Sequence, residues 1–442
     1  SSTVTLVRTA TAPTSPGLGP RPSATRRNRT RLLASLTAAA VTIAACSGSD
    51  DAGPTTTTAV TTTTIEPPPE GDGRLVIGLL LPVNDPELGA SLSSAAELAI
   101  DRINEAGGVL DRSIRTVTAD EGTSAADTAG AIQTLLAQDV DAIVGPASSV
   151  ITLSVLDDIV AAGTVACSPT ASSLMLDDFP DNDLFFRTVP SDTMQAEAIA
   201  EVADQTGSQR AALLFADDAY GRGLEEAVGG ALGGGPITVA DSIALPPGDE
   251  DFGAEARRLG ESEAQIAIVL ADATTTARFL EALDSFDDTG LTAVITNDAV
   301  RNTSTAQRIA GLGPGLRTKI VGVGPQAESD RPDTPFDPPG PFATNAYDCV
   351  NLIALAAEQI GSDAPRDIAG QMASVSASGS VCREFSDCAA SLDAGILIDY
   401  NGPSGVTELL PRRGDPARAV FDRFTFDEEG RDQLQRTFIV GS

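Results

Sequence analysis

The stretch RLVIGLLLPVNDPELGASLSSAAELAIDRINEAGG, residues 74–108, decides the fold of this chain. It opens with the short apolar run Arg74–Leu81, the pattern of a strand that is buried on both faces. Gly107 and Gly108 close it as a helix C-terminal signal would. Between the apolar run and these glycines, apolar residues recur at intervals of three and four, as on one face of a helix. They are Leu92, Ala95, Ala96, Ala99, Ile100 and Ile103. The stretch therefore predicts a strand followed by an amphipathic helix.

The same unit recurs along the chain. Alternating strands and helices build a parallel sheet that is covered by helices. With 442 residues, of which 42% are hydrophobic, the chain is long enough for two or three domain-sized units. The strands are too many for one sheet, so we predict an α/β protein with two Rossmann-like lobes and parallel sheets. Further strands are expected at residues 114–119, 142–145, 164–168, 211–216, 266–271, 293–296 and 319–323.

The residues that the chain lacks restrict its chemistry. It contains no His, which excludes Ser-His-Asp and Cys-His catalysis and removes the usual zinc ligands. Its only Lys, Lys319, is not part of a Gly-Lys-Ser/Thr phosphate loop. A net charge of −33 argues against nucleic acid as a partner. We therefore expect a binding protein and no enzyme, with no cofactor and no metal.

Residues 1–45 have the pattern of an export signal. Four Arg between positions 26 and 31 precede the apolar run 32–45, which is too short to span a bilayer and suits a signal peptide. The small residues before Cys46 resemble a bacterial lipobox, which implies a lipid on the Cys46 sulfur and an anchor on the outer face of the cell membrane. The alternative is an ordinary secretory signal in which Cys46 is incidental. Residues 46–73, rich in Thr and Pro, are predicted to be a disordered stalk.

Polar residues follow three of the predicted strands, at the edge where open α/β sheets bind ligands. Residues 145–149, GPASS, lead from a strand into a helix and place hydroxyls and free backbone N–H groups at its start, where an anionic group could bind. Residues 168–173, SPTASS, do the same after the next strand. Asn297 and Asp298 follow the strand at 293–296 and offer a carboxylate.

These segments resemble the type I periplasmic binding proteins, in particular the leucine/isoleucine/valine and amide receptors of ABC importers. The resemblance extends from Arg74 to about Gly441 and rests on LVIGLLLPV, AAELAIDRINEAGGV, AIVGPASS, ACSPTAS, LFFRTV, ADDAYGRGL and ITNDAV. It implies a monomer that closes two lobes on a small solute and delivers it to ABC permease subunits. A ligand-sensing subunit that signals to a membrane partner has the same fold and is the alternative.

The resemblance also implies three crossovers between the lobes, near Val189, Lys319 and Asp399. Lobe 1 would then comprise residues 74–190 and 319–398, with the strand at 319–323 returning to it. Lobe 2 would comprise residues 191–318 and 399–442, with residues 419–427 completing it.

Five residues match positions that bind the solute in this family. Ser149 would bind its carboxylate, Thr170 and Ser172 its amino-acid head group, and Asp298 its ammonium, while Tyr220 would close over it. Each has a plainer interpretation: Ser149 could cap a helix, Tyr220 could pack on its loop, and Asp298 could form a turn. Ser148 is predicted to be only a cap.

The cargo is left open by one departure from the family. Residues 271–276, ADATTT, lack the aromatic that amino-acid receptors carry there, and Asp272 could supply a second acid instead. An amino acid, an amide or a urea-like solute all remain candidates.

Four Cys remain after Cys46. Cys382 and Cys388 are separated by five residues and are predicted to form a disulfide, which export permits. Cys167 and Cys349 fall in strand and helix contexts, both in lobe 1 by resemblance, and either pair or remain buried thiols. Of these two alternatives, we expect Cys167 and Cys349 to be buried thiols.

Overall fold

The computed structural model describes residues 71–442, with the exception of 247, 287–289, 327–333, 337–338, 406–407 and 442. The predicted signal peptide, Cys46 and nearly all of the predicted stalk lie outside the described residues. Asp72 already donates its backbone N–H to Asp363 Oδ2 at 3.2 Å, so the predicted end of the stalk at residue 73 is too late. Among the described residues, no helix combines the length and the apolar character needed to cross a membrane.

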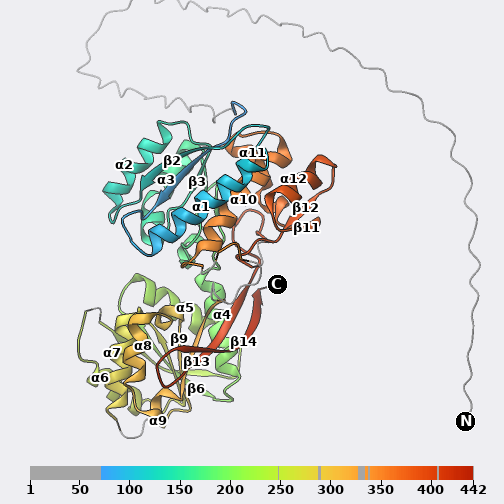
Figure 1. Ribbon diagram of the computed structural model, residues 1–442. Helices are drawn as coiled ribbons and strands as arrows, with labels where there is room; N and C mark the ends of the chain where they lie inside the picture. The colour runs from blue at the N-terminus through green and yellow to red at the C-terminus, as the bar shows by residue number, and fades with distance from the viewer. Residues whose placement is uncertain are drawn as a thin grey trace, which may run out of the picture. The chain divides into compact units, whose positions relative to one another are not determined.

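The first sheet contains five parallel strands. Their order is β2 (Arg115–Asp120), β1 (Val76–Leu81), β3 (Ala142–Val144), β4 (Val165–Ser168) and β5 (Phe185–Arg187). Two groups of helices pack on this sheet (Figure 1). They are α2 (Ala125–Leu136) with α3 (Ser149–Ala162), and α1 (Leu88–Glu105) with α10 (Ala343–Ile360) and α11 (Pro365–Val375). The predicted strand and helix of residues 74–108 are confirmed as β1 and α1.

The second sheet has seven strands and is mixed, because its last two strands run antiparallel to their neighbours. Its order is β14 (Asp432–Gly441), β13 (Arg418–Phe426), β10 (Ile320–Pro325), β9 (Ala293–Thr296), β8 (Ile266–Leu270), β6 (Arg210–Ala216) and β7 (Thr238–Leu245). Its helices are α4 (Asp192–Asp204), α5 (Ala219–Leu232), α6 (Gly253–Glu261), α7 (Ala273–Asp284), α8 (Thr303–Ala310) and α9 (Pro314–Arg317). The predicted α/β fold with parallel sheets is confirmed, and the second sheet adds the antiparallel strands β13 and β14 at one edge.

Both faces of the central strands β6, β8 and β9 of the second sheet are buried, as the unbroken apolar runs predict. Ala211 and Leu213 of β6 belong to one hydrophobic core, whereas Ala212 and Leu214 belong to another. Successive side chains of a strand point to opposite faces, so a strand covered on both sides needs apolar residues at every position.

The strand at 319–323 does not return to the first lobe. It forms β10, which pairs with β9 and β13 in the second sheet. Gly322 makes room for this pairing, because a Cβ there would lie 2.1 Å from the ring of Phe424 on β13. An apolar strand suits either sheet equally, so its local pattern could not assign it. The chain returns to the first half after Pro325.

The predicted boundary at residue 399 also lies too early. The two-stranded sheet of β11 (Ser380–Cys382) and β12 (Ile398–Tyr400) belongs to the first half, together with α12 (Phe385–Asp393). Tyr400 is fully buried in the first core and donates its hydroxyl to Asp348 Oδ1 at 2.7 Å. Leu409 is part of the same core. The last passage into the second half therefore comes shortly before Arg418, where β13 begins.

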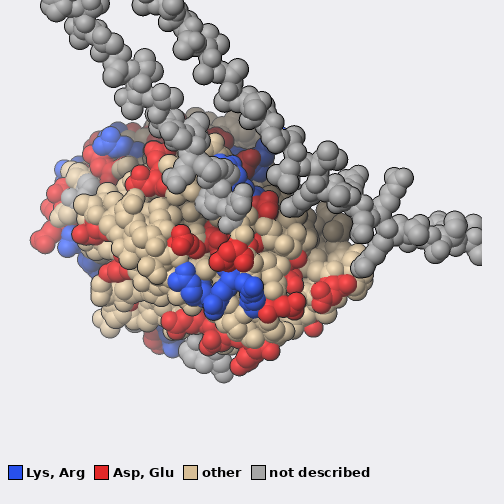
Figure 2. Space-filling view, turned by 90° about the horizontal axis from the view of Figure 1, so that it is seen from above, with Lys and Arg blue, Asp and Glu red and all other residues tan. Residues whose placement is uncertain are grey.

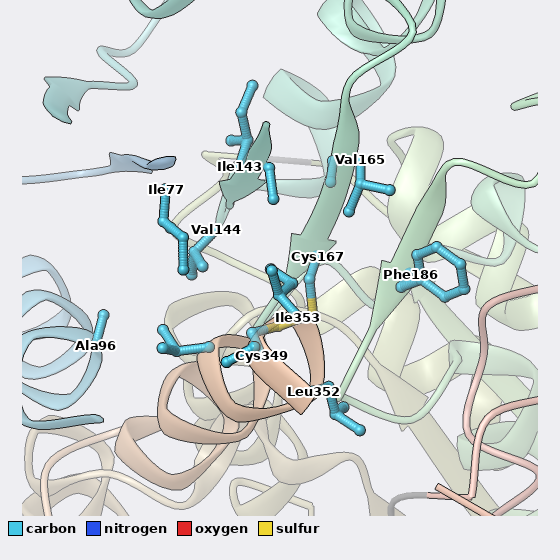
Figure 3. Packing of buried hydrophobic residues seen from close by; sticks show 14 of the residues in the cluster. Ile77, Ala96, Ile143, Val144, Val165, Cys167, Phe186, Cys349, Leu352 and Ile353 are labelled. Atoms are coloured by element: carbon cyan, nitrogen blue, oxygen red, sulfur yellow. A yellow bond between two sulfur atoms is a disulfide. The ribbon is translucent and has the colours of Figure 1, made fainter. Parts of the chain in front are cut away.

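The core of the first half contains a disulfide between its sheet and a helix (Figure 3). Cys167 of β4 and Cys349 of α10 are bonded, with their Cα atoms 5.6 Å apart, so the expectation of two buried thiols is wrong. Packing of α10 against the sheet brings together two residues 182 positions apart. The predicted bond between Cys382 and Cys388 is present, with a Cα separation of 5.4 Å.

The acidity of the chain is spread over its surface. The face shown in Figure 2 carries scattered acidic side chains, with basic side chains gathered in a few places. Such a distribution favours solubility and gives no strong indication of the charge of a ligand.

Candidate functional site

The loop from β3 into α3 places Ser148 and Ser149 at the carboxyl edge of the first sheet. Gly145 allows the chain to turn there: its φ is +112°, and a Cβ would lie 2.0 Å from the Leu80 carbonyl oxygen. Ser148 caps the helix by accepting from the Ile151 N–H at 3.4 Å, as predicted. The hydroxyl of Ser149 instead accepts from the N–H of Ser173 at 3.2 Å, so this side chain joins two loops and is not the cap.

Glu121, directly after β2, occupies part of the helix start that the sequence had suggested for an anionic group. Its carboxylate accepts from the backbone N–H of Ala147 at 2.5 Å and of Ser148 at 3.3 Å. Burial raises the pKa of Glu121, while these two hydrogen bonds oppose the shift. The prediction that these N–H groups are free is therefore wrong for Ala147 and Ser148. The hydroxyls of residues 145–149 and 168–173 remain as candidate contacts for an anionic group.

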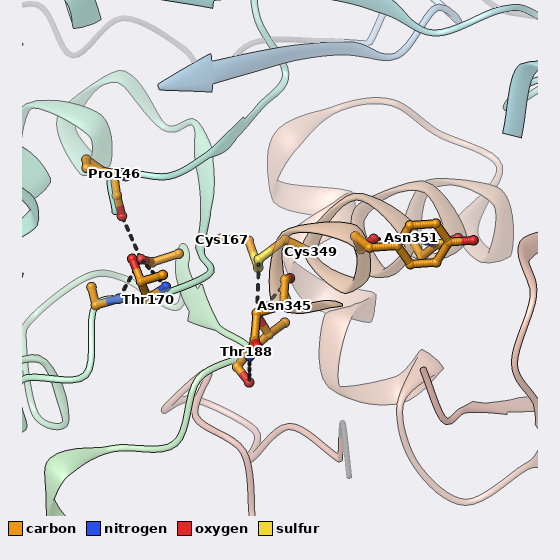
Figure 4. Close-up of a disulfide and its surroundings, with 10 residues drawn as sticks. Pro146, Cys167, Thr170, Thr188, Asn345, Cys349 and Asn351 are labelled. Carbon is orange, nitrogen blue, oxygen red and sulfur yellow. Dashed lines mark hydrogen bonds between the residues drawn. A yellow bond between two sulfur atoms is a disulfide. The ribbon is translucent and has the colours of Figure 1, made fainter. Parts of the chain in front are cut away.

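Residues 168–173 form the second loop at this edge. Thr170 donates its hydroxyl to the Ala147 carbonyl at 2.6 Å, and Ser168 donates to the Pro146 carbonyl at 2.6 Å (Figure 4). The two loops are thereby held side by side. The carbonyl of Ser172 accepts from the backbone N–H of Asp192 at 2.8 Å, which links this loop to the first residue of α4.

Arg187 of β5 holds the backbone of the second loop through hydrogen bonds to its carbonyl groups. Its side chain is fully buried, and its Nη1 donates to the carbonyls of Ala171 at 3.2 Å and Ser173 at 3.0 Å. Its Nε donates to Asp415 at 2.7 Å, and its Nη2 pairs with Asp177. A buried guanidinium that donates to two carbonyls and two carboxylates is well suited to hold the backbone of this loop in one place.

The first crossover is hydrogen-bonded to α10 beside the Cys167–Cys349 disulfide (Figure 4). Thr188 donates its hydroxyl to the Asn345 carbonyl at 2.9 Å, and the Asn345 side chain donates to the Thr188 carbonyl at 2.8 Å. The Thr188 hydroxyl also lies 3.7 Å from the Cys349 sulfur. β5 ends in the first sheet and α4 begins in the second core, so the chain passes between the halves close to Val189, where we placed this crossover.

Asp298 lies at the carboxyl edge of the second sheet, at the start of a short 3-10 helix, Asp298–Val300. Gln195 of α4 donates its side-chain N–H to Asp298 Oδ1 at 2.6 Å. Gly324 of β10 permits this position, because a Cβ there would lie only 2.2 Å from the Asp298 Cβ. Burial raises the pKa of Asp298, against the opposing hydrogen bond from Gln195.

Tyr220 stands in the first turn of α5. Its hydroxyl accepts from Asn297 Nδ2 at 3.2 Å, while 41% of the residue remains exposed. The hydroxyl is the enclosed end of the side chain, and its burial raises the pKa of Tyr220, an effect that the carboxylates of Asp192 and Asp298 reinforce. An exposed ring with an anchored hydroxyl can pack over a solute.

Two further acids lie near the carboxyl edge of the second sheet, Asp272 and Asp192, and they differ in burial. Asp272 is exposed and caps α7, accepting from the N–H groups of Thr274 and Thr275 at 2.8 and 3.1 Å. Asp192 is only 4% exposed. Burial raises its pKa to about 6, with hydrogen bonding by Ser172 lowering it and the charge of Asp298 raising it further. Asp192 was missed because its helix position gives no local signal.

The predicted site residues thus fall into two groups. Ser149, Thr170 and Ser172 lie on joined loops of the first sheet, and Tyr220 and Asp298 lie beside each other at the second. The contact of Ser172 with Asp192 connects the groups. We call these five residues, with Asp192, Gln195 and Asn297, the candidate site.

Two α/β halves joined by crossovers, with polar residues at the carboxyl edges of both sheets, define a two-lobed solute-binding protein. The family model described as periplasmic binding protein matches residues 75–390, so this chain belongs to that family. Its members bind solutes, which confirms the prediction of a binding protein and no enzyme.

Related sequences extend over much of the chain. The chemotactic signal transduction system substrate-binding protein BasB of Halobacterium salinarum is 26% identical over 356 residues, 76% of this chain and 83% of the relative. The Leu/Ile/Val-binding protein BraC3 of Rhizobium johnstonii is 29% identical over 197 residues, 43% of this chain and 53% of the relative.

Solved structures share the fold. A leucine binding protein, LivK, from Thermotoga maritima superposes with a TM-score of 0.64 at 15% identity, covering 82% of this chain and 98% of that structure. The substrate binding protein LivJ of a branched-chain amino acid transporter from Streptococcus pneumoniae, in complex with isoleucine, gives a TM-score of 0.61 at 18% identity. The latter match covers 84% of this chain and all of that structure.

Proposed function

We propose that this chain is the extracytoplasmic solute receptor of an ABC importer and that it binds an amino acid or a related small polar solute at the candidate site. The observation that carries the proposal is the pairing of hydroxyl donors on the loops of the first sheet with an acid and an exposed aromatic ring at the second. Relatives named as Leu/Ile/Val-binding support an amino-acid cargo.

In the proposed complex Ser149, whose hydroxyl only accepts in its contact with Ser173, donates to the carboxylate or carbonyl of the solute. Thr170 and Ser172 contact the head group beside it, and Asp298 binds its amine. The ring of Tyr220 covers the bound solute. Ser149, Thr170, Ser172 and Asp298 are all half-buried, so each is fixed in place while still open to a ligand.

A thermal-shift screen of the purified chain against amino acids, amides, ureas and short organic acids tests this function. A ligand present at a hundred times its Kd should stabilise the protein by about 2.7 kcal/mol. Asp298→Asn and Ser149→Ala should remove the shift. Asp272→Asn is the matched control, because this exposed acid caps α7 and Asn is an equally good cap. An unshifted melting curve with every solute, or hits that neither variant affects, would overturn the site.

A sensing role is the second candidate, favoured by the likeness to a substrate-binding protein of a chemotactic signal transduction system. Uptake separates the two roles. If the chain serves import, deletion of its gene abolishes uptake of the radiolabelled solute found in the screen. If it serves sensing, uptake continues and the response of the cell to that solute is lost.

We further propose that Cys46 carries a lipid that anchors a monomeric receptor to the outer face of the cell membrane. The lipobox-like residues before Cys46 support the proposed lipid. For the cargo, an amide or a urea-like solute is proposed beside an amino acid. Metabolic labelling with a radioactive fatty acid should mark the wild-type chain and not Cys46→Ser. Light scattering of the purified protein should give the mass of one chain.

A further inference from the structure

Asp192 is a buried acid for which the zwitterion arrangement has no use. It is 4% exposed at the start of α4, and its backbone N–H is already engaged by Ser172. Ser172 hydrogen-bonds the carboxylate and Arg187 attracts it, yet its pKa is still raised to about 6, because burial removes its hydration. A positive charge brought by a ligand would stabilise the ionised form further.

The nearby cations of the protein have other acids as hydrogen-bond partners. Arg187 attracts Asp192, but its Nε and Nη2 bond to Asp415 and Asp177. One guanidinium therefore stands among three carboxylates. Arg301, close to Asp298 along the chain, pairs with two further acids, Asp422 and Asp432, at 2.7 and 2.6 Å. Over the whole chain 62 Asp and Glu face 29 Lys and Arg and no His, so acids outnumber the cations that could pair with them.

Geometry brings Asp192 and Asp298 to the same place. Gln195 follows Asp192 by three residues on α4, so the two share a helix face, and its amide nitrogen lies 2.6 Å from Asp298 Oδ1. The charge of Asp298 raises the pKa of Asp192, and the charges of both acids raise the pKa of Tyr220. The negative potential of both therefore extends over one end of the site, and low dielectric around them strengthens it.

An orphaned acceptor points independently to a donor from outside the protein. Asn297 is fully buried, and its side-chain nitrogen donates to the Tyr220 hydroxyl and to the Ala271 carbonyl, each at 3.2 Å. Its Oδ1 receives no hydrogen bond from the described residues. A cationic nitrogen bound beside Asp298 would supply that donor, and the exposed ring of Tyr220 offers it a favourable face.

We propose that the cargo carries an excess of positive charge, as a cationic amino acid or a diamine does, and that Asp192 together with Asp298 selects it. Asp298 binds one cationic nitrogen, and Asp192 supplies the second negative charge. Glu121 adds a third carboxylate near the first sheet and disfavours solutes that are purely anionic. This inference rests on the proposed solute-binding function of the same site.

Calorimetric titration of the wild-type chain with lysine and norleucine tests the inference directly, since the two side chains differ mainly by the terminal ammonium. Lysine should bind at least about thirtyfold more tightly, the effect of one well-placed buried charge pair. Putrescine, which lacks a carboxylate, shows whether the solute is an amino acid or a diamine. Asp192→Asn should abolish the preference for lysine over norleucine, with Asp272→Asn as the control that retains it.

The outcomes separate this inference from the proposed function. Equal or tighter binding of norleucine to the wild-type chain would overturn the cationic cargo and leave the receptor function standing. A preference for lysine that Asp192→Asn leaves unchanged, with that variant folded by circular dichroism, would overturn the role of Asp192. Failure of every amino acid, amide, urea and amine to bind would overturn both.

Discussion

Replacing Cys167 and Cys349 by Ala removes the disulfide that joins β4 to α10 across 182 residues. The loop that it closes contains β5, α4 and the strands of the second sheet up to β10. In the chain-entropy model, a cross-link over a loop of that length stabilises the folded state by about 5 kcal/mol, because it restricts the unfolded chain. We expect the double variant to lose about that much in its free energy of unfolding.

Cys382→Ala with Cys388→Ala provides the matched control. This bond closes a loop with a sequence separation of only 6, which corresponds to about 2 kcal/mol in the same model. The four sulfurs belong to buried residues, so the cavities left by Ala are comparable. The two loops do not overlap in sequence, and the losses should add in the quadruple variant.

Urea denaturation followed by circular dichroism measures both losses, with m-values compared to detect changes in the unfolded state. The long-range bond should cost about 3 kcal/mol more than the short one. Equal losses for the two pairs, or a larger loss for the Cys382–Cys388 pair, would refute the argument from loop length.

Three further perturbations test the packing and charges around the candidate site. Gly324→Ala should weaken solute binding at least about tenfold, because a Cβ 2.2 Å from that of Asp298 must displace this acid; a calorimetric Kd equal to that of the wild type would contradict the close approach. Arg187→Met should lower the free energy of unfolding in urea by about 3–5 kcal/mol, since it leaves buried acids unpaired, and a loss below about 1 kcal/mol would show that the network is not needed. Burial raises the pKa of Asp192 to about 6 in the folded protein, so its contribution to stability is greatest below the pKa of an unfolded Asp, near 4, and is lost as the pH rises through about 6. The difference in unfolding free energy between wild type and Asp192→Asn, measured at several pH values, should follow that course. A difference that is independent of pH would rule out this role of Asp192. Asp141, whose pKa burial raises to about 7, affects the stability of both proteins equally, so its contribution cancels in the difference.

Much of the candidate site could be predicted from the residues that follow strands. Ser149, Thr170 and Asp298 stand within five residues after β3, β4 and β9, and strand ends in an open α/β sheet meet at one edge. Asp192 could not be found in this way, because it opens a helix, and Glu121, although it directly follows β2, carries no local sign of its buried contacts. Their importance depends on burial and on partners from distant segments, Ser172 for the first and Ala147 for the second.

The sequence by itself determined the α/β class, the positions of most strands and helices, and the bond between Cys382 and Cys388. Each of these depends on the periodicity or the spacing of neighbouring residues, which is local information. Only the tertiary structure decided that β10 joins the second sheet, that Cys167 meets Cys349, and that Asp192 shares one end of the site with Asp298. The physical reason is common to all three: apolar strands, buried sulfurs and buried acids are compatible with several partners, and packing of the whole chain selects among them.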